Sequence, residues 1–535
     1  MRDGGVLIGI KSRASVAVQE KPWWAQRVQA RSGIILITLM ILGVFLRFAR
    51  IGLHSVFFDE AYIAWLSSHR WPDLFMQLRF AEFHPPLHYV LMKLWIGVAG
   101  YDEVALRTPS AIFGSVSIVL IYFLARGVAS ESVSLLSALL VAVSPFEIIA
   151  AQDGKMYTLL EMLVLGATLA LAYALEHRTL RLWALYAVLA AAIVYTHYLG
   201  GFVLLAHGVW VSWRHRADAS RWLAAMSAAG ALYLPWVPSL LVQLHQAAVS
   251  PGWGEPGLLW NIEGLVSLFA FGGSLFGAPG FFYMNTWLSP VALLALILPF
   301  LIVFAAGVYA MRRNRDAFPQ FGLPVLVVIG CAFLSVQKSF FLPRWFSFLV
   351  PFYAVFLATG LASIGERLGK FRQPSVVLLT AGLLAYYVPV LDRQYFDPSF
   401  RDRWRDAAAM VGEQFRQGDV ILYGEPQSEL IFTYYIGARR PSMILAIGTR
   451  YFGGAVPVPR LSGKPGVPTP LSVLAGRYQR IWLVVAPPFR PYMLKDTVAV
   501  LQRSAVLAHE FRFLPAPGAA AGVYPLTYLF VSRAP

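Results

Sequence analysis

The sequence predicts a polytopic α-helical membrane protein that ends in a small α/β domain. Hydrophobic residues make up 58% of the 535 residues, only 13% are charged, and the mean hydropathy is +0.61. A soluble domain carries about 25% charged residues. Apolar runs near the length of a spanning helix recur from residue 33 to residue 391. Beyond residue 391, short helical and β-rich runs alternate instead, which is typical of an α/β domain.

The charge balance indicates a membrane rather than nucleic acid as the partner. Lys and Arg exceed Asp and Glu by 44 to 28, a net charge of +16. The basic residues gather in short loops between apolar runs, so we expect contact with membrane lipids and none with nucleic acid. The single cysteine, Cys331, lies in an apolar run, so an intrachain disulfide is excluded.

Basic loops orient the predicted helices, because short loops rich in Lys and Arg stay in the cytoplasm. Residues 1–32 are basic, and no small-residue cleavage site ends the run that follows. We therefore expect an uncleaved first span, a cytoplasmic N-terminus and a place in the inner (cytoplasmic) membrane. About eleven spans result. Their limits are 33–51, 107–126, 133–150, 157–175, 182–200, 201–213, 222–241, 288–311, 321–336, 345–364 and 375–391.

Two long segments are expected on the outer side. Residues 52–106 form the first outer loop, in which the apolar run 87–99 is short and contains Lys93, as expected for an interfacial helix. Residues 242–287 form the second, with a loop over 251–256 and a run at 258–271 that we place at the membrane interface. The transmembrane domain is thus assigned to residues 33–391.

Residues 392–535 are predicted to be an extracytoplasmic soluble α/β domain. The patterns predict helices over 404–416, 428–436 and 492–503, and strands over 420–423, 480–485, 506–514 and 523–531. Residues 453–470 are rich in Gly and Pro and are expected to be a connection.

This topology brings charged and polar groups from several segments to one outer surface, and such groups are costly beside a membrane. Acids suit proton or metal chemistry, and cations suit an anionic group such as lipid phosphate. The groups are Asp59, Glu60, Glu82, His84, His88, Asp153, Lys155, His197, Lys338 and Arg344.

Each group also has a structural interpretation that stays open at this point. Asp59 would cap a helix over 60–67 with Glu60 in its first turn. Glu82 would be a solvated charge, His84 a brace for a turn, Asp153 a partner of Lys155 and His197 a core histidine. Lys338 and Arg344 would reach the interface from a span. Asp102 and Glu103 are expected at a turn, with Arg107 at the start of a span.

Several motifs, taken in their order along the chain, resemble those of GT-C membrane glycosyltransferases. The resemblance is to the polyprenyl-phosphate-sugar users: protein O-mannosyltransferases, lipid A aminoarabinose transferase and lipopolysaccharide galacturonosyltransferases. The motifs are Phe58-Asp59-Glu60-x-Tyr62, His84-Pro85-Pro86-Leu87-His88-Tyr89, Arg107-x-Pro109-Ser110-Ala111-x-x-Gly114, Ser144-Pro145, Ala151-Gln152-Asp153-x-Lys155-x-Tyr157, Thr196-His197-Tyr198, and Arg344-Trp345 followed by Pro351.

The resemblance implies inverting transfer of a hexosyl or pentosyl group from a polyprenyl-phosphate sugar to a hydroxyl on a glycan, lipid or protein of the cell envelope, such as lipopolysaccharide. Asp59 falls on the first-loop Asp of the family, which would deprotonate or orient the acceptor hydroxyl, with Glu60 and Asp153 as further catalytic candidates. The substrate-binding candidates are Tyr62, Glu82, His84, His88, Lys155, Tyr157, His197, Lys338 and Arg344.

Metal binding is left open by the sequence. Some branches of the family carry a Glu-Lys pair before the Pro, where this chain has Phe83-His84 and its acid one position earlier, at Glu82. The candidate ligands of a divalent ion are Glu82, His84 and Asp153, and no other cofactor is predicted.

A transporter or flippase of a lipid-linked or anionic substrate is the main alternative to an enzyme, and a receptor or assembly factor is a third. The polar groups cluster at one surface rather than at the midplane, and no inverted repeat is visible, which favours the enzyme.

Overall fold

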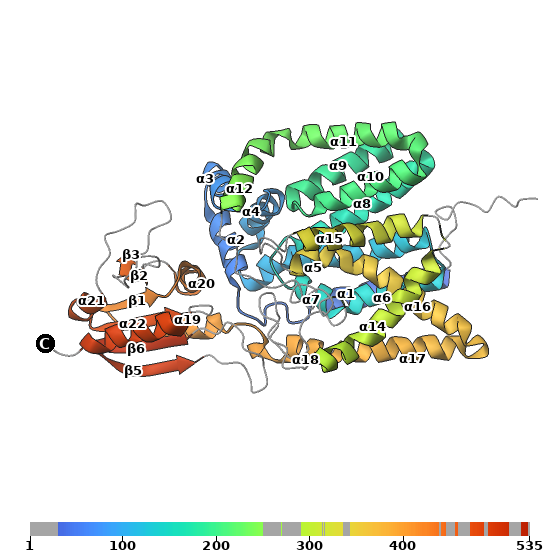
Figure 1. Ribbon diagram of the computed structural model, residues 1–535. Helices are drawn as coiled ribbons and strands as arrows, with labels where there is room; N and C mark the ends of the chain where they lie inside the picture. The colour runs from blue at the N-terminus through green and yellow to red at the C-terminus, as the bar shows by residue number, and fades with distance from the viewer. Residues whose placement is uncertain are drawn as a thin grey trace, which may run out of the picture.

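The computed structural model describes residues 30–249, 269, 290–312, 314, 316–334, 343–437, 440–445, 455–457, 471–485, 491–512 and 526–532. It consists of a helical part and a smaller part built around a sheet (Figure 1). Predictions for residues 1–29, 251–256, 258–268, 458–470 and Lys338 lie outside the described residues.

The helical part begins with α1 (Ala30–Phe48), followed within residues 52–106 by the short helices α2 (Phe58–Ser68), α3 (Trp71–Phe80) and α4 (Leu87–Ala99). The helices that follow are α5 (Glu103–Arg126), α6 (Glu131–Val143), α7 (Pro145–Ala151), α8 (Tyr157–His177), α9 (Leu180–Thr196), α10 (Gly200–Arg214), α11 (Ala219–Tyr233), α12 (Val237–Val249), α14 (Pro290–Met311), α15 (Leu323–Leu334), α16 (Val350–Arg367), α17 (Arg372–Ala385) and α18 (Val388–Phe396).

The helical membrane fold that the sequence predicts is confirmed, and a helix lies at each of the predicted spans. Within the described residues, 5 helices are long and apolar enough to cross a membrane, or up to 7 if two bent pairs each form one span. The number of spans therefore remains a prediction.

The predicted span 133–150 is bent by 55° between α6 and α7. Pro145 has no backbone N–H and disfavours a helical conformation at Ser144, whose ψ is 122°. The Ser144 hydroxyl instead lies 3.5 Å from the Glu147 N–H that it caps. The turn that joins α7 to α8 follows directly after this bent segment.

Helix α5 starts earlier than predicted, because Asp102 is its N-cap rather than part of a separate turn. The Asp102 carboxylate accepts a hydrogen bond from the Ala105 N–H at 2.8 Å. Arg107 therefore lies in the second turn of the helix and not at its start.

The run 87–99 forms α4, a 13-residue helix as its length suggests. Lys93, the one charged residue in this apolar run, makes specific contacts. The Lys93 ammonium donates to the carbonyl oxygens of Ser67, at 2.9 Å, and His69, at the C-terminus of α2. The charge of Lys93 thus joins α4 to α2.

The C-terminal part contains the small sheet that the sequence predicts. Its strand order is β3-β2-β1-β4-β6-β5, with β1 parallel to β2 and β4 and the other pairs antiparallel. The strands are β1 (Asp419–Tyr423), β2 (Ser442–Leu445), β3 (Ala455–Pro457), β4 (Arg480–Val485), β5 (Ala505–Arg512) and β6 (Leu526–Ser532). The helices are α19 (Trp404–Gln414), α20 (Pro426–Ile436), α21 (Leu471–Arg477) and α22 (Pro491–Ser504). The short elements β2, β3 and α21 were not predicted from the sequence.

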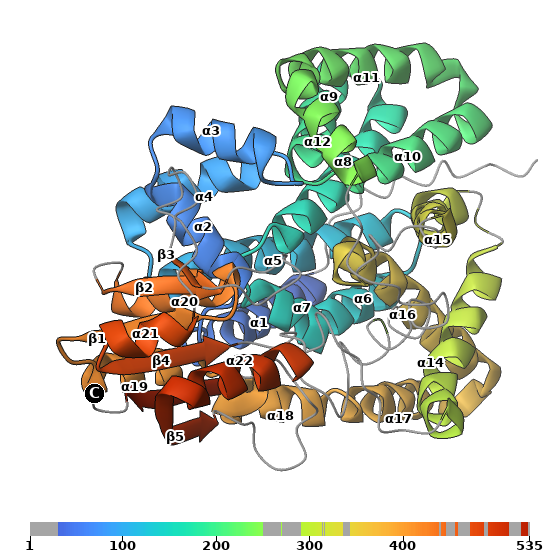
Figure 2. The same ribbon diagram turned by 60° about the vertical axis from the view of Figure 1, so that its left-hand side comes forward.

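The two faces of this sheet pack against different partners, as the alternation of strand side chains requires. Val420 and Leu422 of β1 pack in one cluster with residues of α21 and α22. Ile421 and Tyr423 face the other way, in a cluster with Trp404 of α19 that continues into α2, α3 and α4. The sheet is therefore joined to residues 52–106 through α19 and α20 (Figure 2).

Candidate functional site

Asp59 lies in the first turn of α2, but the N-terminus of this helix is capped by its neighbour. Phe57 is the N-cap residue, and its N–H donates to Glu60 Oε2 at 3.0 Å. Asp59 is therefore not the N-cap of this helix, contrary to its structural interpretation. The Asp59 carboxylate is left to face other segments.

The partners of Asp59 are two cations from distant parts of the chain. Its Oδ1 lies 3.4 Å from Lys155 Nζ, and its Oδ2 lies 3.2 Å from Arg344 Nη2. Burial by itself raises the pKa of Asp59, but Lys155 and Arg344 outweigh it, so the pKa is lowered from its usual value. An ionised carboxylate that is 14% exposed thus lies between two buried cations.

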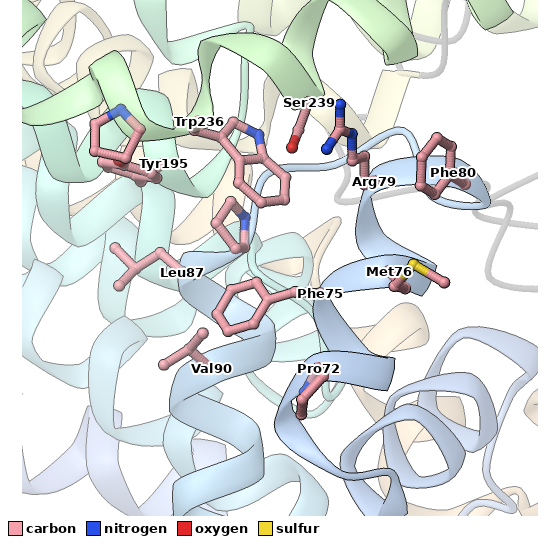
Figure 3. A pocket seen from close by; sticks show the side chains of 12 residues that line it. Pro72, Phe75, Met76, Arg79, Phe80, Leu87, Val90, Tyr195, Trp236 and Ser239 are labelled. Atoms are coloured by element: carbon pink, nitrogen blue, oxygen red, sulfur yellow. The ribbon is translucent and has the colours of Figure 1, made fainter.

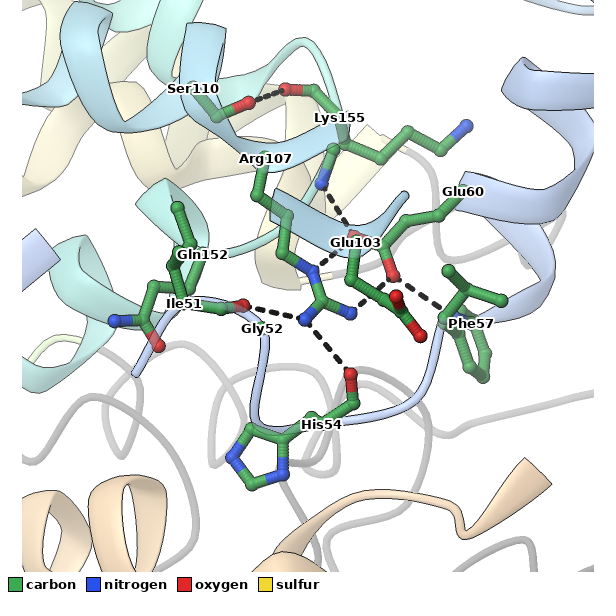
Figure 4. Close-up of polar contacts among 12 residues, drawn as sticks. Ile51, Gly52, His54, Phe57, Glu60, Glu103, Arg107, Ser110, Gln152 and Lys155 are labelled. Atoms are coloured by element: carbon green, nitrogen blue, oxygen red, sulfur yellow. Dashed lines mark hydrogen bonds and ion pairs between the residues drawn. The ribbon is translucent and has the colours of Figure 1, made fainter. Parts of the chain in front are cut away.

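Glu60 is fully buried and makes a two-pronged ion pair with Arg107 (Figure 4). Arg107 Nε lies 2.7 Å from Glu60 Oε1, and Nη2 lies 2.8 Å from Oε2. The Gly154 N–H donates to the same Oε1 at 3.0 Å. Because both oxygens are engaged, this arrangement suits positioning of α2 more than proton transfer.

Arg107 also holds the chain that leads to Asp59. Its Nη1 donates to the carbonyl oxygens of Ile51, at 2.8 Å, and His54, at 3.0 Å. Its Nη2 donates to Ser55 O at 3.0 Å. One guanidinium therefore fixes residues 51–55, the start of α2 and, through Glu60, the turn at Gly154.

The turn between α7 and α8 supplies Asp153 and Lys155 to the site. His88 Nε2 lies 3.2 Å from Gly154 O, and the Ser110 hydroxyl donates to Lys155 O at 3.1 Å. A side chain at Gly154 would meet Leu106 O at 3.1 Å and the Glu60 carboxylate at 3.4 Å, so this close approach favours glycine.

Asp153 has a different environment from Asp59. Lys155, its partner in the alternative structural interpretation, pairs with Asp59 instead. Burial, and then the charge of Glu60, raise the pKa of Asp153 to about 6. This carboxyl therefore changes its charge near neutral pH, whereas Asp59 stays ionised.

The Pro-Pro turn brings Glu82 and His84 to the same region. His84 Nδ1 lies 2.7 Å from Glu82 Oε1, and this partner outweighs burial to lower the pKa of Glu82 to about 2. The His84 ring centroid lies 5.3 Å from that of His197, which in turn lies 6.0 Å from Trp345. His197 is buried at the C-terminal end of α9.

The candidate metal ligands do not meet as a set of three. Glu82 and His84 are hydrogen-bonded to each other, and Asp153 is not grouped with them. Among the described residues, no cluster of three His, Cys, Asp or Glu has metal-binding geometry. Where the structure describes the chain, Glu82, His84 and Asp153 therefore do not form a three-residue metal centre.

Two tyrosines among the candidates lie beside the charged groups. The Arg344 guanidinium lies 5.8 Å from the centroid of the Tyr157 ring, within the range of a cation–π contact. Tyr62 lies one turn from Phe58 and packs against Phe58 and Trp65, at 6.1 and 5.6 Å between ring centroids. Of the predicted site residues, only Lys338 lies outside the described part of the chain.

An apolar cavity of about 590 Å³ opens beside the turn that carries His84 (Figure 3). Phe75 and Met76 of α3, Leu87 of α4, and Trp236 line it, and Arg79 is at its wall. Gln243 of α12 donates to Leu78 O at 2.7 Å and to His84 O at 3.4 Å. The cavity wall is thereby tied to the histidine turn.

Three further buried charged residues were not predicted from the sequence. Arg47, Glu147 and Glu161 are buried in α1, α7 and α8. Arg47 donates to Val141 O and Ala142 O, both at 3.1 Å, which ties α1 to α6. The signal was present, because charges inside apolar runs are rare and are retained for a reason.

Comparison with known proteins gives one family match and several structural matches. A family model described as dolichyl-phosphate-mannose-protein mannosyltransferase matches residues 83–239. No curated protein sequence matches.

The solved structures that match include ArnT from Cupriavidus metallidurans and the oligosaccharyltransferase AglB from Archaeoglobus fulgidus. Apo ArnT is 15% identical, with a TM-score of 0.60, over 94% of this chain and 98% of that one. ArnT bound to undecaprenyl phosphate has 14% identity and a TM-score of 0.55, over 94% and 98%. AglB with an inhibitory peptide and a dolichol-phosphate has 13% identity and a TM-score of 0.54, over 92% and 74%. The predicted resemblance to GT-C proteins is confirmed.

Proposed function

We propose, from the GT-C fold and the family match, that the chain transfers a sugar from a polyprenyl-phosphate donor to an acceptor hydroxyl at the outer face of the cytoplasmic membrane. The observation that carries the proposal is Asp59 between Lys155 and Arg344, at 3.4 and 3.2 Å. A carboxylate next to two cations provides a base beside a site for an anionic leaving group.

The donor phosphate takes the place of Asp59 as partner of the two cations. Lys155 and Arg344 are buried, so their attraction for a phosphate is weakly screened by water. When the bond between the anomeric carbon and the phosphate oxygen breaks, its electron pair leaves with polyprenyl phosphate. The two cations stabilise the charge that develops on that oxygen.

Asp59 is the base that the acceptor meets. With Lys155 and Arg344 engaged by phosphate, its carboxylate loses the ion pairs that lower its pKa and becomes a better proton acceptor. It takes the hydroxyl proton as the acceptor oxygen attacks the anomeric carbon from the face opposite the phosphate. The sugar is therefore transferred with inversion.

The structural relatives support a lipid-phosphate donor, since ArnT is solved with undecaprenyl phosphate and AglB with a dolichol-phosphate. The acceptor is a glycan, a lipid or a protein. The apolar cavity beside His84 offers room for a hydrocarbon part of a substrate. Glu82, His84 and His197 lie close to one another, and we assign to them the binding of polar groups of the sugar or the acceptor.

The proposal is tested by incubating the purified protein with a panel of polyprenyl-phosphate sugars and measuring released polyprenyl phosphate. Asp59→Asn removes the base and should lower turnover by roughly 100-fold or more. Asp73→Asn is the matched control, because Asp73 is a carboxylate of the same loop whose pair with Arg70 is exposed. Turnover in Asp59→Asn equal to that of the wild type contradicts the role of Asp59.

The same assay separates an enzyme from a transporter. A transporter moves its substrate without breaking the bond between sugar and phosphate. Movement of intact donor across a vesicle membrane, with no released polyprenyl phosphate for any donor, would favour the transporter and count against a transferase.

A further inference from the structure

The segment that joins the helical part to the sheet domain reaches back to the active-site turn. It runs from the end of α18 through a 3-10 turn at Pro398–Phe400 to the start of α19. Within it, Arg401 donates from Nη2 to Ile149 O and from Nη1 to Gln152 O, both at 3.3 Å. These carbonyls are at the C-terminal end of α7, where a cation is favoured by the helix dipole.

The Gln152 side chain is hydrogen-bonded to two other helices, α1 and α18. Its amide nitrogen donates to Arg47 O at 3.1 Å and to Ala49 O at 3.0 Å, at the C-terminus of α1. Its amide oxygen accepts from Gln394 Nε2 of α18 at 2.7 Å. The residue before Asp153 is thus held on three sides, and Arg401 holds its backbone.

A second arginine of the same domain, Arg405 in α19, holds the chain that leads to Asp59. Its guanidinium donates to Glu103 Oε1 at 2.7 and 3.0 Å and to Gly52 O at 3.0 Å, and its backbone N–H donates to the Ser55 hydroxyl at 3.0 Å. The Tyr435 hydroxyl of α20 donates to Glu103 at 2.9 Å and accepts from the Val56 N–H at 2.7 Å.

Arg401 and Arg405 lie on either side of Trp404, a side chain fully buried between α19 and the sheet. Trp404 packs against Phe432 of α20, at 6.0 Å between ring centroids. Arg405, in α19, therefore takes its position from the packed core of the C-terminal domain, and Arg401 lies three residues before the core residue Trp404.

We propose that the C-terminal domain positions the active site, with Arg401 holding the Asp153–Lys155 turn and Arg405 holding the chain that leads to Asp59. The inference rests on the proposed function for the meaning of that site. Arg107 grips residues 51–55 from the helical part, and Arg405 grips the same segment from the sheet domain. Arg401 and Arg405 hold the backbone segments next to Lys155 and Asp59, and this supports the 3.4 Å separation between the two side chains.

Arg401 also acts on the site by its charge. Burial and Glu60 raise the pKa of Asp153, and the next largest influence is Arg401, which lowers it. Removing this positive charge should therefore raise the pKa of Asp153 further above its value of about 6. A purely structural role for Arg401 would leave the pH profile of the enzyme unchanged.

The test compares Arg401→Gln, Arg401→Lys and the control Arg403→Gln in the full-length protein. Arg403 is two residues away, but its guanidinium pairs at the surface with Asp406 and is 39% exposed. We expect Arg401→Gln to lower kcat by roughly 10-fold to 100-fold, because misplacement of reacting groups acts on the chemical step, with a smaller rise in KM for the donor. Arg401→Lys should restore the pH profile, since it restores the charge, and only part of kcat.

Hydrogen exchange gives a readout that does not depend on turnover. Arg401→Gln should speed exchange of the amides at residues 152–155, and Arg405→Gln those at residues 52–56, while Arg403→Gln changes neither segment. Unchanged exchange in both arginine variants contradicts the positioning role. Faster exchange with an unchanged kcat and pH profile contradicts the link to catalysis. Absence of transfer in the wild type with every donor contradicts the proposed function instead.

Discussion

The ion pair between Glu60 and Arg107 gives the sharpest energetic prediction. The two side chains are 0% and 1% exposed, so each charge depends on the other. Glu60→Gln keeps the size of the side chain but leaves the guanidinium without its counter-charge. Breaking one half of a buried pair costs about 3–5 kcal/mol. Arg107 keeps its bonds to Ile51 O, His54 O and Ser55 O, so we expect the lower end of that range.

The assay is unfolding of the purified protein in mixed micelles with increasing denaturing detergent, followed by tryptophan fluorescence. Arg107→Gln and the double variant complete a double-mutant cycle. The double variant removes both charges. Its loss of unfolding free energy should therefore be smaller than the sum of the two single losses by about 1–3 kcal/mol. The exposed pair of Arg70 and Asp73, at 86% and 44% exposure, is the control and should contribute about 0–1 kcal/mol.

The result that would refute this reasoning is a Glu60→Gln variant with unchanged unfolding free energy and no turnover. Glu60 would then act in the chemistry, as its place beside Asp59 in the sequence allows. Loss of stability with turnover reduced in proportion to the folded fraction would instead assign it to positioning.

Three further predictions concern the charges and the topology. Asp153 has a pKa of about 6, so it is ionised above that pH and repels an anionic donor. Donor affinity should therefore rise by roughly 3-fold to 10-fold as the pH falls from 7 to 5. Asp153→Asn should bind the donor tightly at both pH values. Lys155→Ala and Arg344→Ala should each weaken donor binding by roughly 10-fold to 100-fold, measured by equilibrium titration; a change below 3-fold in both would contradict the phosphate site. In a Cys331→Ser background, Ser68→Cys should react with a membrane-impermeant maleimide in intact cells and Ala217→Cys only after permeabilisation, and the reverse pattern would invert the predicted topology.

Much of the fold follows from hydropathy, because spans and helices have strong periodic signals. The strands β1 and β4 were also predicted, since each is a continuous buried run. The short strands β2 and β3 and the helix α21 have too few residues to show a period. The bend at Pro145 was visible as a proline but not as a 55° angle, which depends on packing.

The membership of the site was predictable where topology alone decides it. Asp59, Lys155 and Arg344 are far apart in sequence, and the basic loops were enough to place them on one side. Pairing was not predictable, because it depends on which helix faces which. Lys155 was expected beside Asp153 and lies beside Asp59, while Glu60 takes the capping role considered for Asp59. Arg401 and Arg405 belong to a second domain, and no local sequence pattern predicts their contacts with the site.

The central claim is a sugar transfer at Asp59, and the most direct measurement is the product itself. Purified protein, a polyprenyl-phosphate sugar and an acceptor should yield one released polyprenyl phosphate for each new glycoside, with the anomeric configuration inverted when the product is read by nuclear magnetic resonance. Asp59→Asn should abolish both products, and Asp73→Asn should leave both unchanged. A retained configuration, or full turnover in Asp59→Asn, would contradict the proposed mechanism.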